Sequence, residues 1–371
     1  MKFVLFTHVP HHQVENVYFA YSPYVREMNI WAKHVDEFVV VAPLVSKEVS
    51  VIDASYSHQN MQFISVPSFD LLSVNSILRT FFKLPILFWT LYKAMRVADH
   101  IHLRCPGNVG LLGCLVQILF PKKPKSAKYA GNWDPKSKKP WSYQLQKWIL
   151  SNTFLTRNMK VLVYGVWEGS TRNIKPFFTA TYSENEKIAS ETKVLEGLID
   201  FVFVGTLVKG KNPLYAIKMM EGLHLKGHHV RLRIYGEGIE RKLLENYIET
   251  KQLASIVFLK GNQSKELIQK AYQESHFVIL PSASEGWPKA IAEGMFWSCV
   301  PLATKVSCIP FMLDFGNRGL LLTMDLANDC LQMENFLINQ PLYDDMQIQA
   351  ATWSQKYTTE LFESEILKIL K

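Results

Sequence analysis

Two glutamates, Glu285 and Glu293, lie eight residues apart around a predicted helix start. An apolar run ends at Leu280, a polar loop follows, and Pro288 stands where a helix would begin, since proline is favoured in a first helical turn. Carboxylates accept hydrogen bonds from vicinal hydroxyls and repel phosphate. The pair therefore predicts recognition of hydroxyls at the two ends of a nucleotide sugar.

The backbone between the two glutamates predicts an anion site. The amides of Gly286, Trp287 and Lys289 precede or open the predicted helix, so no carbonyl of that helix accepts from them. Such amides and the helix dipole favour phosphate. The alternative, in which Glu285 caps the helix and Glu293 lies in solvent, is the usual interpretation of charged residues taken alone.

Alternating strands and helices must position these residues. In the first half, apolar β runs alternate with helical patterns, which indicates a parallel sheet covered on both faces. The predicted strands are 3–6, 37–42, 63–66, 99–103, 127–130 and 160–164, and the predicted helices are 24–34, 77–97 and 110–120.

The same alternation restarts after a polar stretch at 183–192. The predicted strands are 199–204, 231–235, 256–259, 277–280 and 300–303, and the predicted helices are 213–225, 240–251, 265–274 and 288–296. A chain of 371 residues also exceeds one typical core. We therefore predict an α/β protein with two doubly wound domains, residues 1–182 and 183–353.

The motif around the two glutamates is more extensive than the pair itself. It reads E-G-W-P-K and A-x-A-E-G-M, and V-P-L-A-T and Ile309-Pro310 follow. The combination resembles the E-x7-E motif of family-4 retaining glycosyltransferases, which have the GT-B fold. This resemblance covers most of the chain, with its specific motifs in 200–310. It implies two Rossmann-like domains facing a cleft and a C-terminal helix, 354–371, that crosses back to the first domain.

A second segment, F-V-G-T-L-V-K-G-K-N-P, is similar to the family's G-R-L-x-x-x-K-G loop. Gly205 and Lys211 match, and the resemblance implies that Lys211 holds the donor diphosphate. Thr206 stands where arginine is usual, which should weaken stabilisation of the leaving group unless Lys209 or Lys289 compensates. Taken alone, the two lysines of this segment are typical of a solvated loop.

Two other turns carry weaker evidence. Gly236 and Gly238 form a G-x-G turn like that of the family, although any turn after a strand can contain glycine. The run V-F-L-K-G, with Leu259 and Lys260, resembles the strand beside which the family binds the nucleobase through backbone contacts.

Candidate acceptor residues lie in the first half. Arg104, Asn132 and Asp134 come just past predicted strands, where open α/β sheets bind ligands. His8 follows the first strand, where the family often has a glycine-rich loop. The sequence Asn-Trp-Asp-Pro is equally suited to a turn.

The sequence predicts no metal and no cofactor. His8, His11 and His12 could together hold zinc, but no second ligand cluster accompanies them. No Asp-x-Asp occurs, which argues against a metal-held diphosphate. Five scattered cysteines without a CxxC motif favour a reduced, cytosolic chain.

The net charge of +8 arises in the first half, where residues 1–180 hold 21 Lys and Arg against 10 Asp and Glu. Seven lysines fall within 122–139, and the predicted helix 77–97 combines cationic with aromatic residues: Arg79, Lys83, Lys93 and Arg96 with Phe81, Phe82, Phe88 and Trp89. This combination favours an anionic membrane surface, and a core helix with a solvated edge is the alternative. Nucleic acid is disfavoured, because no nucleic-acid-binding motif accompanies the charge. No apolar run is long enough to span a bilayer.

The resemblance implies a metal-independent transfer that retains anomeric configuration, from a UDP or GDP sugar to a hydroxyl. Lys211, Lys289 and the helix amides would stabilise the leaving diphosphate, Glu285 would orient the sugar and Glu293 would hold the ribose. The leaving phosphate can itself take the acceptor's proton. The expected acceptor is a lipid-linked glycan at the inner face of the cell membrane, as in bacterial surface-polysaccharide or capsule biosynthesis.

Two other functions remain open. One is a sugar-nucleotide epimerase of the same fold, and the other is a non-catalytic partner subunit, to which Thr206 gives some weight. A nicotinamide dehydrogenase is disfavoured, since no G-x-G-x-x-G follows the first strand.

Overall fold

The computed structural model describes residues 1–67, 74–187 and 192–371, with side chains from Lys83 onward in the helix that begins at Val74. It forms two compact units: unit 1 is Met1–Thr179 with Phe362–Lys371, and unit 2 is Ala180–Leu361. The sequence placed the first boundary after residue 182, within three residues of this division. Part of the predicted seam, 188–191, lies outside the described residues, as do the side chains of Arg79, Phe81 and Phe82.

Unit 1 is built on a seven-stranded sheet in the order β10-β9-β8-β7-β1-β4-β6, with every neighbouring pair parallel. Its strands are β1 (Lys2–Phe6), β4 (Glu37–Pro43), β6 (Met61–Val66), β7 (His100–Cys105), β8 (Lys125–Tyr129), β9 (Met159–Tyr164) and β10 (Ile174–Phe177). Central strands such as β4 are almost entirely buried, as expected for a parallel sheet covered on both faces.

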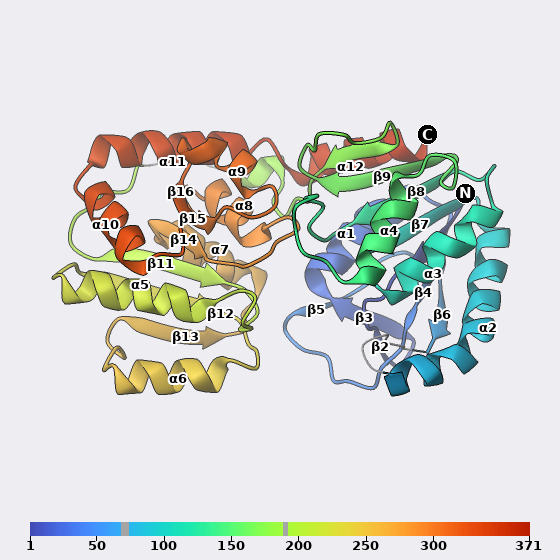
Figure 1. Ribbon diagram of the computed structural model, residues 1–371, viewed down its shortest axis with the longest axis horizontal. Coiled ribbons are helices and arrows are strands. Elements are labelled where there is room, and N and C mark those ends of the chain that lie inside the picture. The colour runs from blue at the N-terminus through green and yellow to red at the C-terminus, as the bar shows by residue number, and fades with distance from the viewer. Residues whose placement is uncertain (68–73, 188–191) are drawn as a thin grey trace. The chain divides into compact units, whose positions relative to one another are not determined.

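Helices cover both faces of this sheet. They are α1 (Ser22–Ala32), α2 (Val74–Val97), α3 (Asn108–Val116) with the 3-10 turn η1 (Gln117–Leu119), α4 (Trp141–Ser151) and α12 (Thr359–Leu370). From β1 the chain first adds β4 and β6 on one side of the sheet, and after β6 it returns to add β7, β8, β9 and β10 on the other side of β1. Because the crossovers are right-handed, this reversal places α2, α3 and α4 on one face and α1 on the other (Figure 1).

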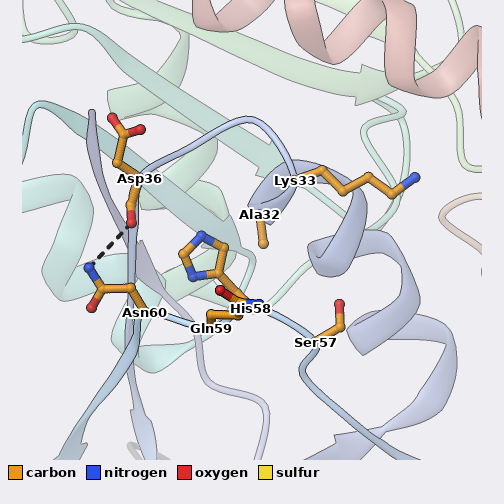
Figure 2. Close-up of a pocket in the computed structure, with 7 residues that line it drawn as sticks. All are labelled: Ala32, Lys33, Asp36, Ser57, His58, Gln59 and Asn60. Carbon is orange, nitrogen blue, oxygen red and sulfur yellow. Dashed lines mark hydrogen bonds between the residues drawn. The ribbon is translucent and has the colours of Figure 1, made fainter.

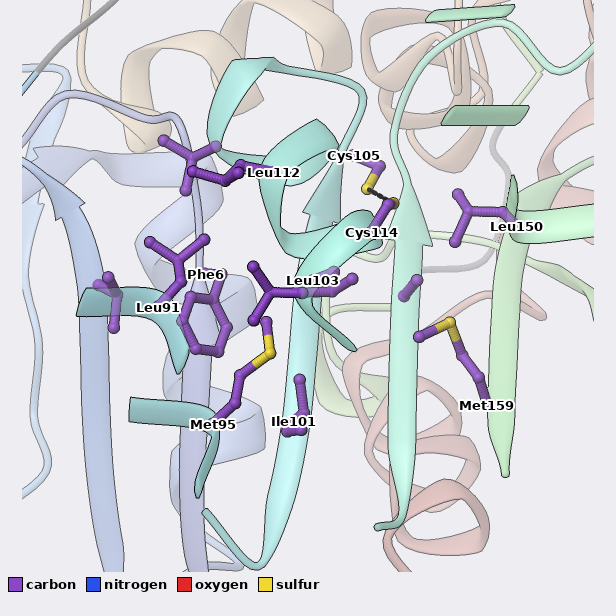
Figure 3. Close-up of a cluster of buried hydrophobic side chains, with 14 of the residues drawn as sticks. Phe6, Leu91, Met95, Ile101, Leu103, Cys105, Leu112, Cys114, Leu150 and Met159 are labelled. Carbon is purple, nitrogen blue, oxygen red and sulfur yellow. Dashed lines mark hydrogen bonds between the residues drawn. The ribbon is translucent and has the colours of Figure 1, made fainter. Parts of the chain in front are cut away.

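The core of unit 1 lies between the sheet and α2 and α3. Leu91 and Met95 of α2 belong to the same buried cluster as Phe6 of β1 and Leu103 of β7 (Figure 3). Each such fully buried side chain contributes roughly 1.5–3 kcal/mol relative to an exposed one. This packing holds β1 and β7 in register, and with them the loops at their carboxyl ends.

A small antiparallel sheet of β2 (His12–Val14), β3 (Val17–Tyr21) and β5 (Asp53–Ser55) is inserted after β1. The sequence pattern does not predict this sheet. Its strands have three to five residues, too short for a periodic pattern to be recognised.

Unit 2 contains a six-stranded parallel sheet in the order β13-β12-β11-β14-β15-β16. Its strands are β11 (Ile199–Val204), β12 (Val230–Tyr235), β13 (Val257–Gly261), β14 (Phe277–Leu280), β15 (Val300–Thr304) and β16 (Leu320–Leu322). Its helices are α5 (Pro213–Leu225), α6 (Arg241–Thr250), α7 (Lys265–Glu274), α8 (Lys289–Phe296), α9 (Ile309–Met312), α10 (Leu326–Leu337) and α11 (Gln340–Ser354), with 3-10 turns η2 (Glu184–Glu186) and η3 (Asp314–Gly316).

The predicted fold class is confirmed: each unit is a Rossmann-like α/β layer structure. The C-terminal helix begins later than the predicted residue 354. α11 ends at Ser354, and α12 begins at Thr359 after Thr358, whose hydroxyl accepts a hydrogen bond from the Leu361 amide at 3.4 Å. Within the described part of the chain, every helix is too short or too polar to cross a bilayer.

Candidate functional site

The loops at the carboxyl edge of the unit 2 sheet are tied together through their backbones. The Gly205 amide donates to the Tyr235 carbonyl at 2.9 Å, and the Leu207 amide donates to the Glu237 carbonyl at 3.0 Å. A Cβ atom at Gly236 would lie 2.0 Å from the Gly205 oxygen, and the φ angle there is +141°. Glycine is therefore required at this turn, and two predicted donor residues, Gly205 and Gly236, lie side by side.

Lys211 and Glu285 form an ion pair at the same edge, with Nζ 2.5 Å from Oε1. The Glu285 side chain is 5% exposed and that of Lys211 is 30% exposed. Their loops follow the adjacent strands β11 and β14, and the Ala283 amide donates to the Gly210 carbonyl at 2.9 Å. The sheet order thus brings together the two residues that the sequence predicted to act on the donor.

The loop that carries Glu285 is held by the loop after β15. The Thr304 hydroxyl donates to the Ser282 carbonyl at 2.5 Å. Ser307 Oγ and Cys308 Sγ both donate to the Gly286 carbonyl, at 3.2 and 3.3 Å. Burial raises the pKa of Cys308 to about 12, so the thiol keeps the proton that it donates. These contacts fix the approach of the chain to α8.

The N-terminus of α8 follows Pro288, whose side chain makes no capping hydrogen bond. The first amides of this helix, beginning with Lys289, have no acceptor within it and lie close in sequence to Glu285. The Trp287 ring packs against those of Trp353 and Tyr357, with centroids 6.2 and 5.7 Å apart. The Trp287 side chain therefore anchors the loop, and a contribution to anion binding would come from its backbone.

Glu293 lies one turn further along α8 and is partly buried. Its Oε1 accepts a hydrogen bond from Thr181 Oγ1 at 2.7 Å, and its Oε2 accepts one from the Tyr272 hydroxyl at 3.4 Å. Burial and the nearby Glu293 carboxylate raise the pKa of Tyr272 well above its usual value, so the phenol remains a donor. Glu293 thus accepts hydrogen bonds from two neutral hydroxyls.

The remaining donor-side residues lie on the same sheet edge with simpler surroundings. Thr206 is exposed, as is Lys209, which the sequence offered as a replacement cation. Leu259 pairs with Ile234 in the sheet, and the Lys260 ammonium lies 5.3 Å from the centre of the Phe258 ring.

In unit 1, Arg104 is buried in an ion pair. Its Nη1 donates to Glu27 Oε1 at 2.5 Å, and the fully buried Lys128 lies 3.1 Å from the same oxygen. Burial opposes the charge on Arg104, but Glu27 outweighs it and the pKa of Arg104 is raised. Thr179 also donates to Glu27, at 3.3 Å. Arg104 therefore forms a buried ion pair inside unit 1, and its predicted contact with an acceptor stays a prediction.

The other acceptor-side residues are divided between a turn and the loop after β1. The Asn132 side chain accepts from the Asp134 amide at 2.9 Å, and the Asp134 side chain accepts from the Lys136 amide at 2.8 Å, so the turn interpretation describes their local geometry. His8 lies against Gly107, where a Cβ would come within 2.4 Å of its Nδ1. Burial of part of the ring and the Arg104 charge lower the pKa of His8.

The three histidines after β1 point to different partners. His11 bonds to the Val9 carbonyl at 2.8 Å and the Tyr56 hydroxyl at 2.7 Å, and burial lowers its pKa to about 4. His12 lies 3.7 Å from Asp53. Among the described residues, no three potential ligands converge on one point.

A cavity of about 350 Å³ lies away from these sites (Figure 2). It is bounded by the end of α1 and by the residues that precede β4 and β6, so it opens at the amino edge of the unit 1 sheet. Its lining comprises Ala32, Lys33, Asp36, Ser57, His58, Gln59 and Asn60.

Sequence reasoning missed four residues of these clusters: Thr181 and Tyr272 beside Glu293, and Glu27 and Lys128 beside Arg104. None stands in a motif. Their partners are between 21 and 112 residues away in sequence, and only folding brings them together.

Most of unit 2 resembles a known protein family. Residues 184–353 match the family model of the glycosyl transferases group 1. An uncharacterised glycosyltransferase of Methanocaldococcus jannaschii is 27% identical over 167 residues, a match that spans 44% of this chain and 46% of that relative.

Two solved structures are similar over the full chain. Sucrose-phosphate synthase of Thermosynechococcus elongatus has a TM-score of 0.69 at 14% identity, covering 100% of this chain and 98% of that one. Anabaena HepE, solved with UDP and glucose, has a TM-score of 0.68 at 13% identity, covering 100% and 99%. The chain thus has the fold of GT-B glycosyltransferases, and the family match supports sugar transfer.

Proposed function

We propose that this protein is a retaining, family-4-like glycosyltransferase that moves a sugar from a nucleoside diphosphate sugar to a hydroxyl of a glycan. The observation that carries the proposal is the Lys211–Glu285 ion pair close in sequence to the N-terminus of α8, within the segment that matches the glycosyl transferases group 1 model. A cation, the N-terminus of a helix and a carboxylate are the groups that a diphosphate and a sugar hydroxyl need.

Each residue would have a separate task. Lys211, Lys289 and the first amides of α8 stabilise the negative charge that develops on the departing diphosphate. Glu285 accepts hydrogen bonds from the sugar hydroxyls, and Glu293 accepts them from the ribose. The departing phosphate takes the proton of the acceptor hydroxyl, so the chain need supply neither a base nor a metal.

The Lys211–Glu285 pair also sets the order of events in this proposal. Without donor, the Lys211 charge is compensated by Glu285. An incoming diphosphate competes for the ammonium, and Glu285 then becomes available to the sugar. Nucleotide binding and sugar orientation are in this way coupled through one pair of side chains.

The test combines ligand binding with product analysis. The purified protein is screened by thermal shift with UDP, GDP and their glucose, mannose and N-acetylglucosamine derivatives, and products are identified by NMR. We expect stabilisation by one nucleotide class and a product that keeps the anomeric configuration of its donor. Isomerised nucleotide sugar without an acceptor would instead identify an epimerase, and no stabilisation by any nucleotide would favour a non-catalytic subunit.

We further propose that the acceptor is lipid-linked and that the protein works at the inner face of the cell membrane, on a pathway to a surface polysaccharide. The supporting observation is a patch on unit 1 where α2 meets η1, which we call the α2–η1 patch. Its exposed or half-exposed members are Ile86, Trp89, Tyr92, Lys93, Arg96, Leu119, Phe120, Lys122 and Lys123.

Ring and cation contacts make this patch continuous. Trp89 and Tyr92 stack with centroids 5.5 Å apart, and Tyr92 lies 5.3 Å from Phe120. Lys93 lies 5.2 Å from the Trp89 ring, and Lys123 lies 5.9 Å from the Phe120 ring. Aromatic rings beside cations suit an interface of anionic headgroups, where each basic residue contributes about 1 kcal/mol.

The structure narrows the predicted lysine cluster. Lys125 and Lys128 are buried, so they cannot contact headgroups and do not contribute to this surface. Lys123 donates to the Arg96 carbonyl at 2.7 Å. Lys122, Lys136 and Lys138 are the members of the cluster that remain exposed.

Vesicle co-sedimentation tests the membrane proposal. The variant carries Trp89→Ala, Lys93→Glu and Lys122→Glu, and we expect it to lose binding to vesicles that contain phosphatidylglycerol. A control on unit 2, Phe311→Ala with Lys242→Glu and Lys270→Glu, has the same change of charge at exposed positions. Equal loss in both variants, or equal binding of the wild type to purely zwitterionic vesicles, would contradict the assignment of this patch.

A further inference from the structure

We propose that Thr181, in the segment that joins the two units, is a positioning residue for the donor nucleotide, because it holds the Glu293 carboxylate in the orientation that accepts a ribose diol. The inference rests on the proposed function and goes beyond it by assigning a role to a residue outside every recognised motif. It begins from the 2.7 Å hydrogen bond that Thr181 Oγ1 donates to Glu293 Oε1.

The two oxygens of Glu293 have separate donors. Thr181 reaches Oε1, and the Tyr272 hydroxyl approaches Oε2 at 3.4 Å from α7, which packs on α8. A glutamate has three rotatable side-chain bonds, and one donor on each oxygen selects both a rotamer and the plane of the carboxylate. Two vicinal hydroxyls bind best to a carboxylate whose two oxygens are both presented in that plane.

Thr181 is itself held firmly on unit 2. The next residue, Tyr182, is buried, and its ring lies 4.9 Å from that of Phe296 and 5.1 Å from that of Trp297, at the end of α8. The Tyr182 carbonyl also accepts from the Thr359 amide at 2.9 Å, which pairs it with the second segment that joins the units. The hydroxyl of Thr181 is therefore delivered to Glu293 by a fixed backbone.

The chemistry of these donors suits a binding role. Thr181 and Tyr272 are neutral donors, so their hydrogen bonds orient Glu293 without adding a charge beside it. A carboxylate can accept about four hydrogen bonds. The two hydroxyls orient the group and do not exhaust its capacity as an acceptor.

The experiment compares two ligands on three variants by isothermal titration calorimetry. The ligands are UDP and 2′,3′-dideoxy-UDP, which lacks the hydroxyls that Glu293 would bind, or GDP and its dideoxy form if thermal shift selects guanine. The variants are Thr181→Val, Thr181→Ser, and the matched control Thr358→Val, which removes a buried hydroxyl from the second joining segment, where it donates to Glu184 at 2.7 Å.

We expect Thr181→Val to weaken binding of the nucleoside diphosphate about three- to tenfold, since one positioning hydrogen bond is lost. Binding of the dideoxy ligand should stay unchanged, Thr181→Ser should restore the wild-type affinity, and Thr358→Val should affect both ligands alike. Equal weakening of both ligands by Thr181→Val would overturn the inference and leave only a structural anchor. Tighter binding would also overturn it, because Thr181 would then compete with the ribose.

Failure of the proposed function would give a different result in the same titrations. In that case the wild-type protein binds neither UDP nor GDP, whatever residue stands at position 181. Binding of the natural ligand with no difference between it and the dideoxy form contradicts only the ribose role of Glu293, and with it the role of Thr181.

Discussion

The carboxyl edges of the two sheets both carry charged clusters, but only one of them reaches solvent. In unit 2, Lys211 is 30% exposed, and its partner Glu285 lies close in sequence to the N-terminus of α8. In unit 1, Arg104 and Lys128 share Glu27 in the interior, and Lys128 is also surrounded by the rings of Tyr164, Phe177 and Phe362 at 5.0 to 5.3 Å.

The difference separates the cluster that we propose binds the donor from a structural one. The Lys128 ammonium makes two further contacts inside the fold. It donates to the Phe178 carbonyl at 2.9 Å, and it contacts Phe362, the first residue of the C-terminal segment that belongs to unit 1. A ligand that bound to Lys128 or Arg104 would have to disrupt this packing. A ligand that bound to Lys211 would need only to replace Glu285 as its partner.

The largest effect is expected from Glu27→Gln, which leaves Arg104 and Lys128 buried without a counter-charge. Breaking a buried ion pair costs about 3–5 kcal/mol, so we expect a loss of that size in the free energy of unfolding of unit 1. Hydrogen exchange of the β7 and β8 amides, measured by mass spectrometry, reports it. In the same measurement, Glu285→Gln should change the free energy of unfolding of unit 2 by less than about 1 kcal/mol, because the Lys211–Glu285 pair is partly exposed.

Lys211→Met should leave the fold intact and nearly abolish transfer. Removing one preorganised charge from a developing anion typically lowers kcat by about 100- to 1000-fold. Steady-state kinetics with the donor found by thermal shift measures the change, and Lys209→Met at the exposed neighbouring position serves as the control. A similar loss in the control would mean that Lys209 replaces the arginine missing at Thr206.

Glu285→Gln tests whether Glu285 and the donor diphosphate compete for Lys211 in unit 2. It removes the charge that neutralises Lys211, so we expect the nucleoside diphosphate to bind about three- to tenfold more tightly, while transfer is lost with the sugar contact. Calorimetry with UDP or GDP measures the affinity. Weaker binding of the diphosphate would contradict the proposed competition for Lys211.

The smallest effect concerns Lys125, a buried cation of unit 1 with hydrogen bonds to the Gln117 and Phe120 carbonyls at 3.3 and 3.1 Å. Burial lowers the pKa of Lys125 to about 8, against about 10.4 in the unfolded chain. Between these values the unfolded state binds more protons, so stability rises with pH. Relative to Lys125→Met, the wild type should gain about 1 kcal/mol between about pH 7.5 and 9 in urea unfolding.

Much of the fold could be predicted because its information is local. The periodic runs that became β4, β11 and β14 are continuous and apolar, and the glycine at 236 stands where a backbone approaches within contact distance. The short strands β2, β3 and β5 were missed because three to five residues contain no usable period.

The residues of the candidate sites also divide into those that stand in sequence motifs and those that only the fold brings together. Glu285, Lys211 and the start of α8 stand in motifs, and the parallel sheet brings adjacent strand ends together, so their meeting followed from strand order. The partners of Glu293 and Arg104 stand in no motif, and neither composition nor spacing indicates that Thr181, Tyr272, Glu27 or Lys128 faces them.

The sequence by itself determined that this protein has two α/β units, and it predicted the residues of a nucleotide-sugar site in the second. Only the tertiary structure decided which of its many cations are available to a ligand. The physical reason is that the ionic role of a lysine depends on burial and on partners far away in the chain: the same residue type binds solvent at Lys122, a carboxylate at Lys211 and the interior at Lys128.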